Sequence, residues 1–88
     1  MAGDAESKMG ALIASWRTNA GLSQTGLAEA IGKTQATVSK LESGTSKPNI
    51  VQIIEILNAC GLHLIDVAND LEVAVHADCR PLWERIDE

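Results

Sequence analysis

A short polar stretch in the first half of the chain carries the side chains best suited to hydrogen bonding. It runs GKTQATVSKLESG from Gly32 to Gly44, and its large apolar side chains, Val38 and Leu41, are spaced i, i+3. The other side chains between the two glycines are small, hydroxylated, amide-bearing or charged. The pattern predicts a short helix anchored by two residues, with an outer face that offers amides, hydroxyls and an ammonium group to a polar partner.

Charge is divided unevenly along the 88-residue chain, which has a net charge of −5. Residues 8–50 hold five Lys and Arg against two Glu, whereas residues 51–88 hold eight Asp and Glu against two Arg. This asymmetry indicates that the basic half meets a polyanion, while the acidic half faces solvent, itself or another protein. Ordinary solvated surface charge is the alternative explanation.

Length and composition predict one small helical domain. At 88 residues the chain has room for one modest core, and with Trp16 and Trp83 as its aromatic residues that core must be aliphatic. No apolar run is long enough for a membrane span, and the polar N-terminus does not resemble a secretory signal. We therefore expect a cytoplasmic protein in which Cys60 and Cys79 are small hydrophobic residues rather than disulfide partners.

Four amphipathic segments follow one another, each bounded by turn or capping residues. Ser23, Thr34 and Asn49 are each placed to cap the N-terminus of a helix, while Gly21 and Gly32 are placed to end one. The predicted helices begin near Met9 and at the three caps. The last of the four, IVQIIEILNAC, is apolar on more than one side and therefore needs a second surface to bury.

The second and third segments, joined by a tight glycine turn, have the layout of a helix-turn-helix. A motif runs through this stretch in the residues Arg17, Gly21, Leu22, Ser23, Gln24, Leu27, Ala28, Gly32, Val38, Ser39, Leu41, Glu42, Gly44 and Pro48. On these residues the sequence resembles the Cro/C1-type (XRE) helix-turn-helix repressors, over roughly Met9 to Gly61. Gly26 departs from the family pattern, inside a helix where glycine costs about 1 kcal/mol relative to alanine.

The resemblance implies a lambda-repressor-like, mainly α domain of four to five helices that binds double-stranded DNA. It makes residues 34–43 the recognition helix, in which Gln35 is suited to adenine and Lys40 to a guanine or a phosphate. Gln24 and Thr34 resemble phosphate-binding residues, and Lys33 and Lys47 extend the basic rim. The DNA-binding residues expected are Gln24, Lys33, Thr34, Gln35, Ala36, Thr37, Ser39, Lys40 and Lys47.

Arg17 and Glu42 occupy motif positions with a different expected role. They resemble a partly buried ion pair that joins the first helix to the third. Contact of either residue with DNA is the alternative.

The chain after Gly61 predicts a dimerisation appendage. LHLIDVANDLEVAVHA holds two apolar, β-branched runs around Asn69-Asp70, which favours a β-hairpin with a two-residue turn. We therefore expect a flexible tail over residues 1–7, the DNA-binding domain over 8–61, and a strand or hairpin with an acidic tail over 62–88. This layout is similar to that of HipB-type antitoxins, in which a C-terminal strand pairs across the dimer.

The same hairpin would bring four metal-binding side chains together. Cys60 and His63 mirror the spacing of His76 and Cys79, so a Cys₂His₂ zinc site is conceivable. A cysteine packed on the apolar side of a helix and two ordinary cross-strand histidines explain the pattern better, so we expect no metal and no cofactor.

These features predict a homodimeric repressor of a palindromic operator, either the antitoxin and autorepressor of a toxin-antitoxin pair or a stand-alone regulator. A module that mainly neutralises a toxin protein is the alternative from another class. We expect no enzyme, because the sequence offers no phosphate-binding glycine loop and no nucleophile–base pair.

Overall fold

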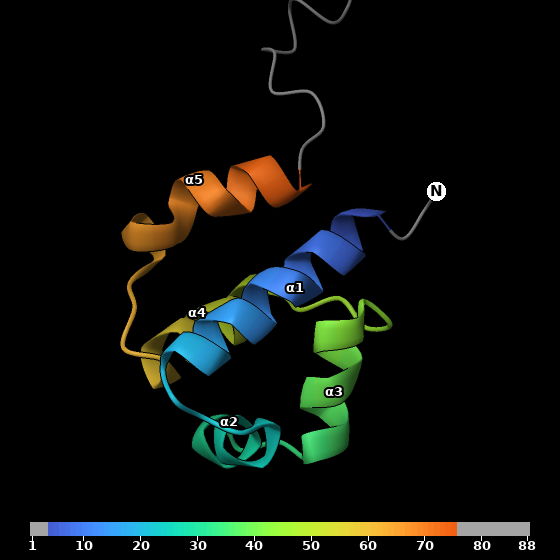
Figure 1. The fold of residues 1–88 in the computed structure, drawn as a ribbon, viewed down its shortest axis with the longest axis vertical. Coiled ribbons are helices and arrows are strands. Elements are labelled where there is room, and N and C mark those ends of the chain that lie inside the picture. Colours follow the sequence, from blue (N-terminus) through green and yellow to red (C-terminus); the bar gives the residue numbers. More distant parts are fainter. Residues whose placement is uncertain (1–3, 76–88) are drawn as a thin grey trace, which may run out of the picture.

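The computed structural model describes residues 4–75, and in that range the chain forms five helices (Figure 1). They are α1 (Asp4–Asn19), α2 (Gln24–Ile31), α3 (Gln35–Ser43), α4 (Ile50–Ala59) and α5 (Leu64–Val75). The mainly α, helix-turn-helix class expected from the sequence is confirmed.

Capping side chains set the starts of the three middle helices, as the sequence predicts. Ser23, Thr34 and Asn49 have extended backbones, and each side chain accepts a hydrogen bond from a backbone N–H in the first turn of the helix that follows. Gly32 and Gly44 end α2 and α3 in the left-handed conformation, at φ 71° and 83°. These signals fix short helices whose own propensity would not hold them in water.

Helix α1 lies at the centre of the fold and supports both α3 and α5 (Figure 1). Helix α2 packs against α3 and α4. The core is aliphatic apart from Trp16, and its most deeply buried side chains come from four different helices: Ile13, Leu27, Val38, Ile56 and Leu57.

Backbones of α1 and α3 approach each other closely because two glycines leave room. A Cβ atom built on Gly10 would overlap the carbonyl oxygen of Glu42 and lie 2.7 Å from the carbonyl oxygen of Leu41. A Cβ on Gly44 would lie 3.0 Å from the Cα of Ser7. The first turns of α1 are therefore seated directly on the C-terminal turn of α3.

The predicted hairpin around Asn69-Asp70 is wrong, because these residues lie within α5. Val67, Leu71 and Ala74 recur at i, i+4 and i+7 and turn toward α1, so packing favours a helix over the strands suggested by β-branched residues. Asp66 accepts a hydrogen bond from the backbone N–H of His63 (3.0 Å), which stabilises the first turn. A strand after residue 75 would lie outside the described residues.

The expected division into residues 1–7, 8–61 and 62–88 stays a prediction. In the structure, α1 begins at Asp4. Val67 of α5 is 5% exposed and belongs to the same core as side chains of α1 to α4. The acidic tail beyond Val75 falls outside the described range. Among the described helices, none has the length and apolar character needed to cross a membrane.

Candidate nucleic-acid interface

Helices α2 and α3 form a rigid pair around Gly32. The backbone N–H of Lys33 donates to the carbonyl of Ala28 (2.8 Å), which closes the C-terminus of α2 before Thr34 starts α3. Ala28 is 2% exposed and Val38 is fully buried, so the two helices meet through small and branched apolar side chains. This arrangement fixes the direction in which the outer face of α3 points.

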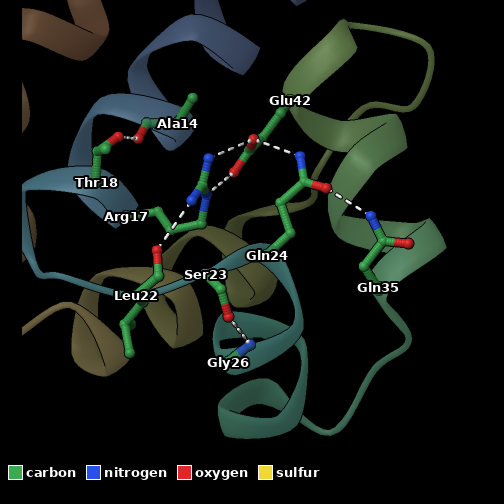
Figure 2. Close-up of polar contacts among 9 residues, drawn as sticks. All are labelled: Ala14, Arg17, Thr18, Leu22, Ser23, Gln24, Gly26, Gln35 and Glu42. Carbon is green, nitrogen blue, oxygen red and sulfur yellow. Dashed lines mark hydrogen bonds and ion pairs between the residues drawn. The ribbon is translucent and has the colours of Figure 1, made fainter.

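A polar network ties α3 to α1 and α2 (Figure 2). Arg17 makes two hydrogen bonds to the Glu42 carboxylate, from Nε to Oε2 (2.6 Å) and from Nη2 to Oε1 (3.2 Å). Its Nη1 donates to the carbonyl of Leu22 (2.9 Å). Gln24 donates through Nε2 to Glu42 Oε1 (2.9 Å), and Gln35 donates through Nε2 to Gln24 Oε1 (2.5 Å). The network thus runs from α1 through Glu42 to the first residues of α2 and α3.

The ion pair at the centre of this network is largely shielded from water. The Arg17 and Glu42 side chains are 17% and 8% exposed. The hydrogen bond to Glu42 raises the pKa of the Arg17 guanidinium, against the opposing effect of burial, so Arg17 stays charged. A two-pronged guanidinium–carboxylate pair has a fixed geometry, and here it fixes the position of Gln24.

The outer face of α3 presents side chains for which the sequence predicts contacts with DNA. Gln35, Ala36 and Lys40 are exposed, while Thr37 and Ser39 are half-buried at its flanks. Ala36, Lys40 and Ser43 lie on one face at i, i+4 and i+7. Amide, methyl and ammonium groups therefore line a slim surface that no other described side chain covers.

The N-terminus of α3 is occupied by two hydroxyl groups. Thr34 Oγ1 accepts from the backbone N–H of Thr37 (3.2 Å) and lies 3.0 Å from Thr37 Oγ1. Thr34 is therefore a helix cap in the free protein, and the phosphate contact expected of it would have to share this hydroxyl.

The two lysines of the expected basic rim occupy different places. Lys33 is exposed in the turn between α2 and α3. Lys47, 78% exposed, lies between α3 and α4 with its Nζ 3.6 Å from Glu6 Oε2 on α1. An exposed ion pair of this kind contributes little free energy, so Lys47 is free to change its partner.

Sequence reasoning missed two features of this surface. The first is the link from Glu42 through Gln24 to Gln35, since a spacing of 18 residues gives no local signal. The second is a hydroxyl pair, Ser43 and Thr45, whose oxygens lie 2.9 Å apart at the C-terminal end of α3. The position of Ser43 at i+7 from Ala36 was the available signal for its place on the outer face.

The zinc site suggested by the sequence depended on a hairpin, which residues 64–75 do not form. His63 and His76 were to be cross-strand neighbours, but residues Leu64–Val75 are helical. Cys60 is a half-buried free thiol, and no group of three metal-binding side chains exists within residues 4–75. His76 and Cys79 are beyond the described range.

Comparisons with known proteins agree with this geometry. Residues 13–67, more than half of the chain, match a family model described as helix-turn-helix. The fold is similar to the crystal structure of the clp gene regulator ClgR from C. glutamicum, with a TM-score of 0.71 and 24% identity over 81% of this chain and 91% of that chain. At this identity the likeness shows the fold alone. No curated protein matched the sequence.

Proposed function

Because the chain belongs to the Cro/C1-type (XRE) helix-turn-helix family of DNA-binding regulators, we propose that it represses transcription by binding a palindromic operator as a homodimer. The observation that carries the proposal is the exposed outer face of α3, held in place by the network from Arg17 to Gln35. A helix positioned in this way can enter the major groove with its N-terminal side chains toward the base edges.

Three side chains of this face have specific roles in the proposal. Gln35 donates one N–H to Gln24, which leaves its second N–H and its Oε1 for the N7 and N6 groups of adenine. Ala36 contacts a thymine methyl group, and Lys40 contacts guanine or a phosphate. Gln24, Lys33, Thr34 and Lys47 contact phosphates, which position the module but do not select the sequence.

The charge of the protein makes the specific contacts decisive. With a net charge of −5, the protein repels DNA at long range, whereas the local excess of cations in residues 8–50 attracts it. Non-specific binding is therefore weak, and two half-sites about one DNA turn, roughly 34 Å, apart must be occupied together for tight binding. An operator that overlaps a promoter would then be closed to polymerase.

A stand-alone regulator is favoured over the antitoxin of a toxin-antitoxin pair. The antitoxin hypothesis depended on a C-terminal strand shared between subunits, and residues 64–75 form a helix packed on α1 instead. Within residues 4–75, no strand supports a toxin partner, whereas the DNA-binding face of α3 does not depend on one.

The test begins with selection of DNA sites from a random pool, followed by titration of selected and random DNA at several salt concentrations. We expect Gln35→Ala to cost about 1–3 kcal/mol on the selected site and to relax one base-pair position. Lys33→Ala should weaken all sequences alike and reduce the salt slope by about 1. Asn58→Ala, an exposed amide on α4, is the matched control and should change neither. Selection that yields no consensus, or equal losses on random DNA for Gln35→Ala, would contradict the proposal.

A further inference from the structure

Helix α4 exposes three large apolar side chains on the first half of its length. Ile50, Val51 and Ile54 are 57%, 61% and 41% exposed, at i, i+1 and i+4. The opposite side of the same helix buries Ile56 and Leu57 completely. We call Ile50, Val51 and Ile54 the α4 patch. Large apolar side chains gathered on one exposed face of a helix mark an interaction surface.

The α4 patch differs in charge from the other exposed apolar face, on α5. Ile65 and Val73 are 84% and 64% exposed there, but α5 also carries Asp66, Asp70 and Glu72 and no Lys or Arg. Two copies joined through α5 would bring carboxylates against carboxylates. The α4 patch is uncharged and therefore complementary to itself, as a two-fold symmetric contact requires.

We propose that the α4 patch packs against the same patch of a second copy of this chain, with the two α4 helices antiparallel and crossing near Val51. The inference rests on the proposed homodimer and assigns its contact surface. Lys47 lies four residues before Val51 and Glu55 four residues after it, and both are exposed. An antiparallel crossing at Val51 therefore faces Lys47 toward Glu55 of the partner subunit, so opposite charges flank the patch at both ends.

The chain connection places this contact close to the recognition helix. Helix α3 ends at Ser43 and α4 begins at Ile50, so the patch follows α3 after a short loop that contains Lys47. The weak 3.6 Å pair between Lys47 and Glu6 does not hold that lysine away from a partner. Subunits joined at α4 thereby hold their two α3 helices in a fixed relation, which is what a palindrome demands.

Three side chains make a small contact, which sets the expected strength of the dimer. A standard stable interface buries about 800 Å² on each partner and involves roughly 20–30 residues a side. The α4 patch is much smaller than such an interface. Dimers should therefore form in the micromolar range, and a palindromic site should strengthen them by binding both subunits at once.

The experiment is sedimentation velocity on the full chain without DNA, over about 1–200 µM. Val51→Glu should weaken dimerisation at least tenfold, because it places two like charges at the two-fold axis. Ile65→Glu introduces the same charge at the more exposed position on α5 and should leave the dimer unchanged. Thermal unfolding of both variants identifies any change that comes from misfolding.

A charge exchange tests the crossing without altering the apolar patch. Lys47→Glu and Glu55→Lys should each weaken the dimer several-fold, and the double variant should restore it. Because DNA is absent, the phosphate contact proposed for Lys47 does not enter the measurement.

The outcomes separate this inference from the proposed function. If Val51→Glu stays dimeric and two copies still bind a palindrome, the surface is wrong but the proposed function stands. If the wild-type chain binds DNA as one copy per site, the proposed homodimer fails. If Val51→Glu lowers the melting temperature without changing the mass, the patch is covered by another segment of the same chain, and the inference is overturned.

Discussion

Helix α1 supports two neighbours, α3 and α5, in very different ways. Against α3 the backbones nearly touch at Gly10, and the Arg17–Glu42 ion pair joins the same two helices. Against α5 the contact is made by apolar side chains, among them the buried Val67 and Ala74. Two hollows, of about 410 and 300 Å³, lie along the α1–α5 contact.

The difference is consistent with the recognition role proposed for α3. A recognition helix must position its side chains to within about 0.5 Å of the geometry that contacts the base edges. Close backbone packing and the Arg17–Glu42 ion pair restrict the movement of α3. Nothing in the described structure requires α5 to be positioned as precisely. It should therefore open at a lower free energy than the α1–α3 contact, as weakly packed elements generally do.

The largest expected effect is at Gly10. Gly10→Ala should destabilise the protein by about 3 kcal/mol, because the new methyl group overlaps the backbone of α3, which cannot move aside as a flexible side chain can. Urea unfolding followed by circular dichroism measures the change.

Gly26→Ala is the matched control, since it makes the same substitution inside α2. The new methyl group would lie 3.2 Å from Ser23 Oγ and 3.7 Å from a methyl group of Leu22, with no backbone in the way. Helix propensity should then dominate and stabilise the protein by somewhat less than about 1 kcal/mol. Similar changes in stability for the two variants would contradict the close backbone packing of α1 against α3 at Gly10.

The next largest effect distinguishes the Arg17–Glu42 ion pair from the Lys47–Glu6 ion pair. Glu42→Ala should destabilise by about 2.5 kcal/mol, because it leaves the shielded Arg17 charge without its partner and Gln24 without its acceptor. Glu6→Ala removes the partner of the exposed Lys47 and should cost less than about 0.5 kcal/mol. If both variants unfold at the same urea concentration, the Arg17–Glu42 pair contributes no more to stability than the exposed Lys47–Glu6 pair.

A pair of identical core truncations compares the two neighbours of α1 directly. Val38→Ala in α3 removes two methyl groups from a fully buried site and should cost about 2 kcal/mol. Val67→Ala in α5 should cost only about 1 kcal/mol, since its surroundings can collapse into the adjoining hollow. A larger loss for Val67→Ala would mean that α5 is as tightly packed as α3.

The same contrast explains what the sequence alone could predict. Around α2 and α3 the local signals agree with the packing: Ser23 and Thr34 cap, Gly32 and Gly44 end, and Val38 and Leu41 anchor. The fold of this region and the outer face of α3 were therefore accessible from the sequence. The tie from Gln24 to Glu42 was not, because it joins side chains from different helices.

At α5 local and tertiary signals conflict. Val67, Val73 and the Asn69-Asp70 pair suggest strands and a turn, whereas the spacing of Val67, Leu71 and Ala74 fits a helix only once α1 is present to receive it. β-propensity is weak and depends on context, so packing decided the outcome. The close approach at Gly10 was equally hidden, since a glycine inside a helix does not indicate which backbone lies opposite.

The smallest expected effect is chemical and reports on opening of α5. Cys60 lines the smaller hollow together with Val67 and Trp16. Burial raises the pKa of the Cys60 thiol, and the nearby charge of Arg17 only partly opposes this, so the reactive thiolate is scarcer than in an unfolded chain. In a Cys79→Ser background, a disulfide reagent at pH 8 should label Cys60 at least several-fold more slowly than it labels the urea-unfolded protein.

The same shift makes folding stability depend on pH. Because the Cys60 thiol keeps its proton in the folded state at a pH where the unfolded thiol has lost it, folding stability should fall as the pH rises above about 8.5.

The labelling rate also distinguishes opening of α5 from global unfolding. Val67→Ala should speed labelling more than Val38→Ala does, even though it costs less global stability, because only Val67 belongs to the contact that must open. Labelling rates that instead follow the global stability of the two variants would mean that α5 and α3 leave α1 together.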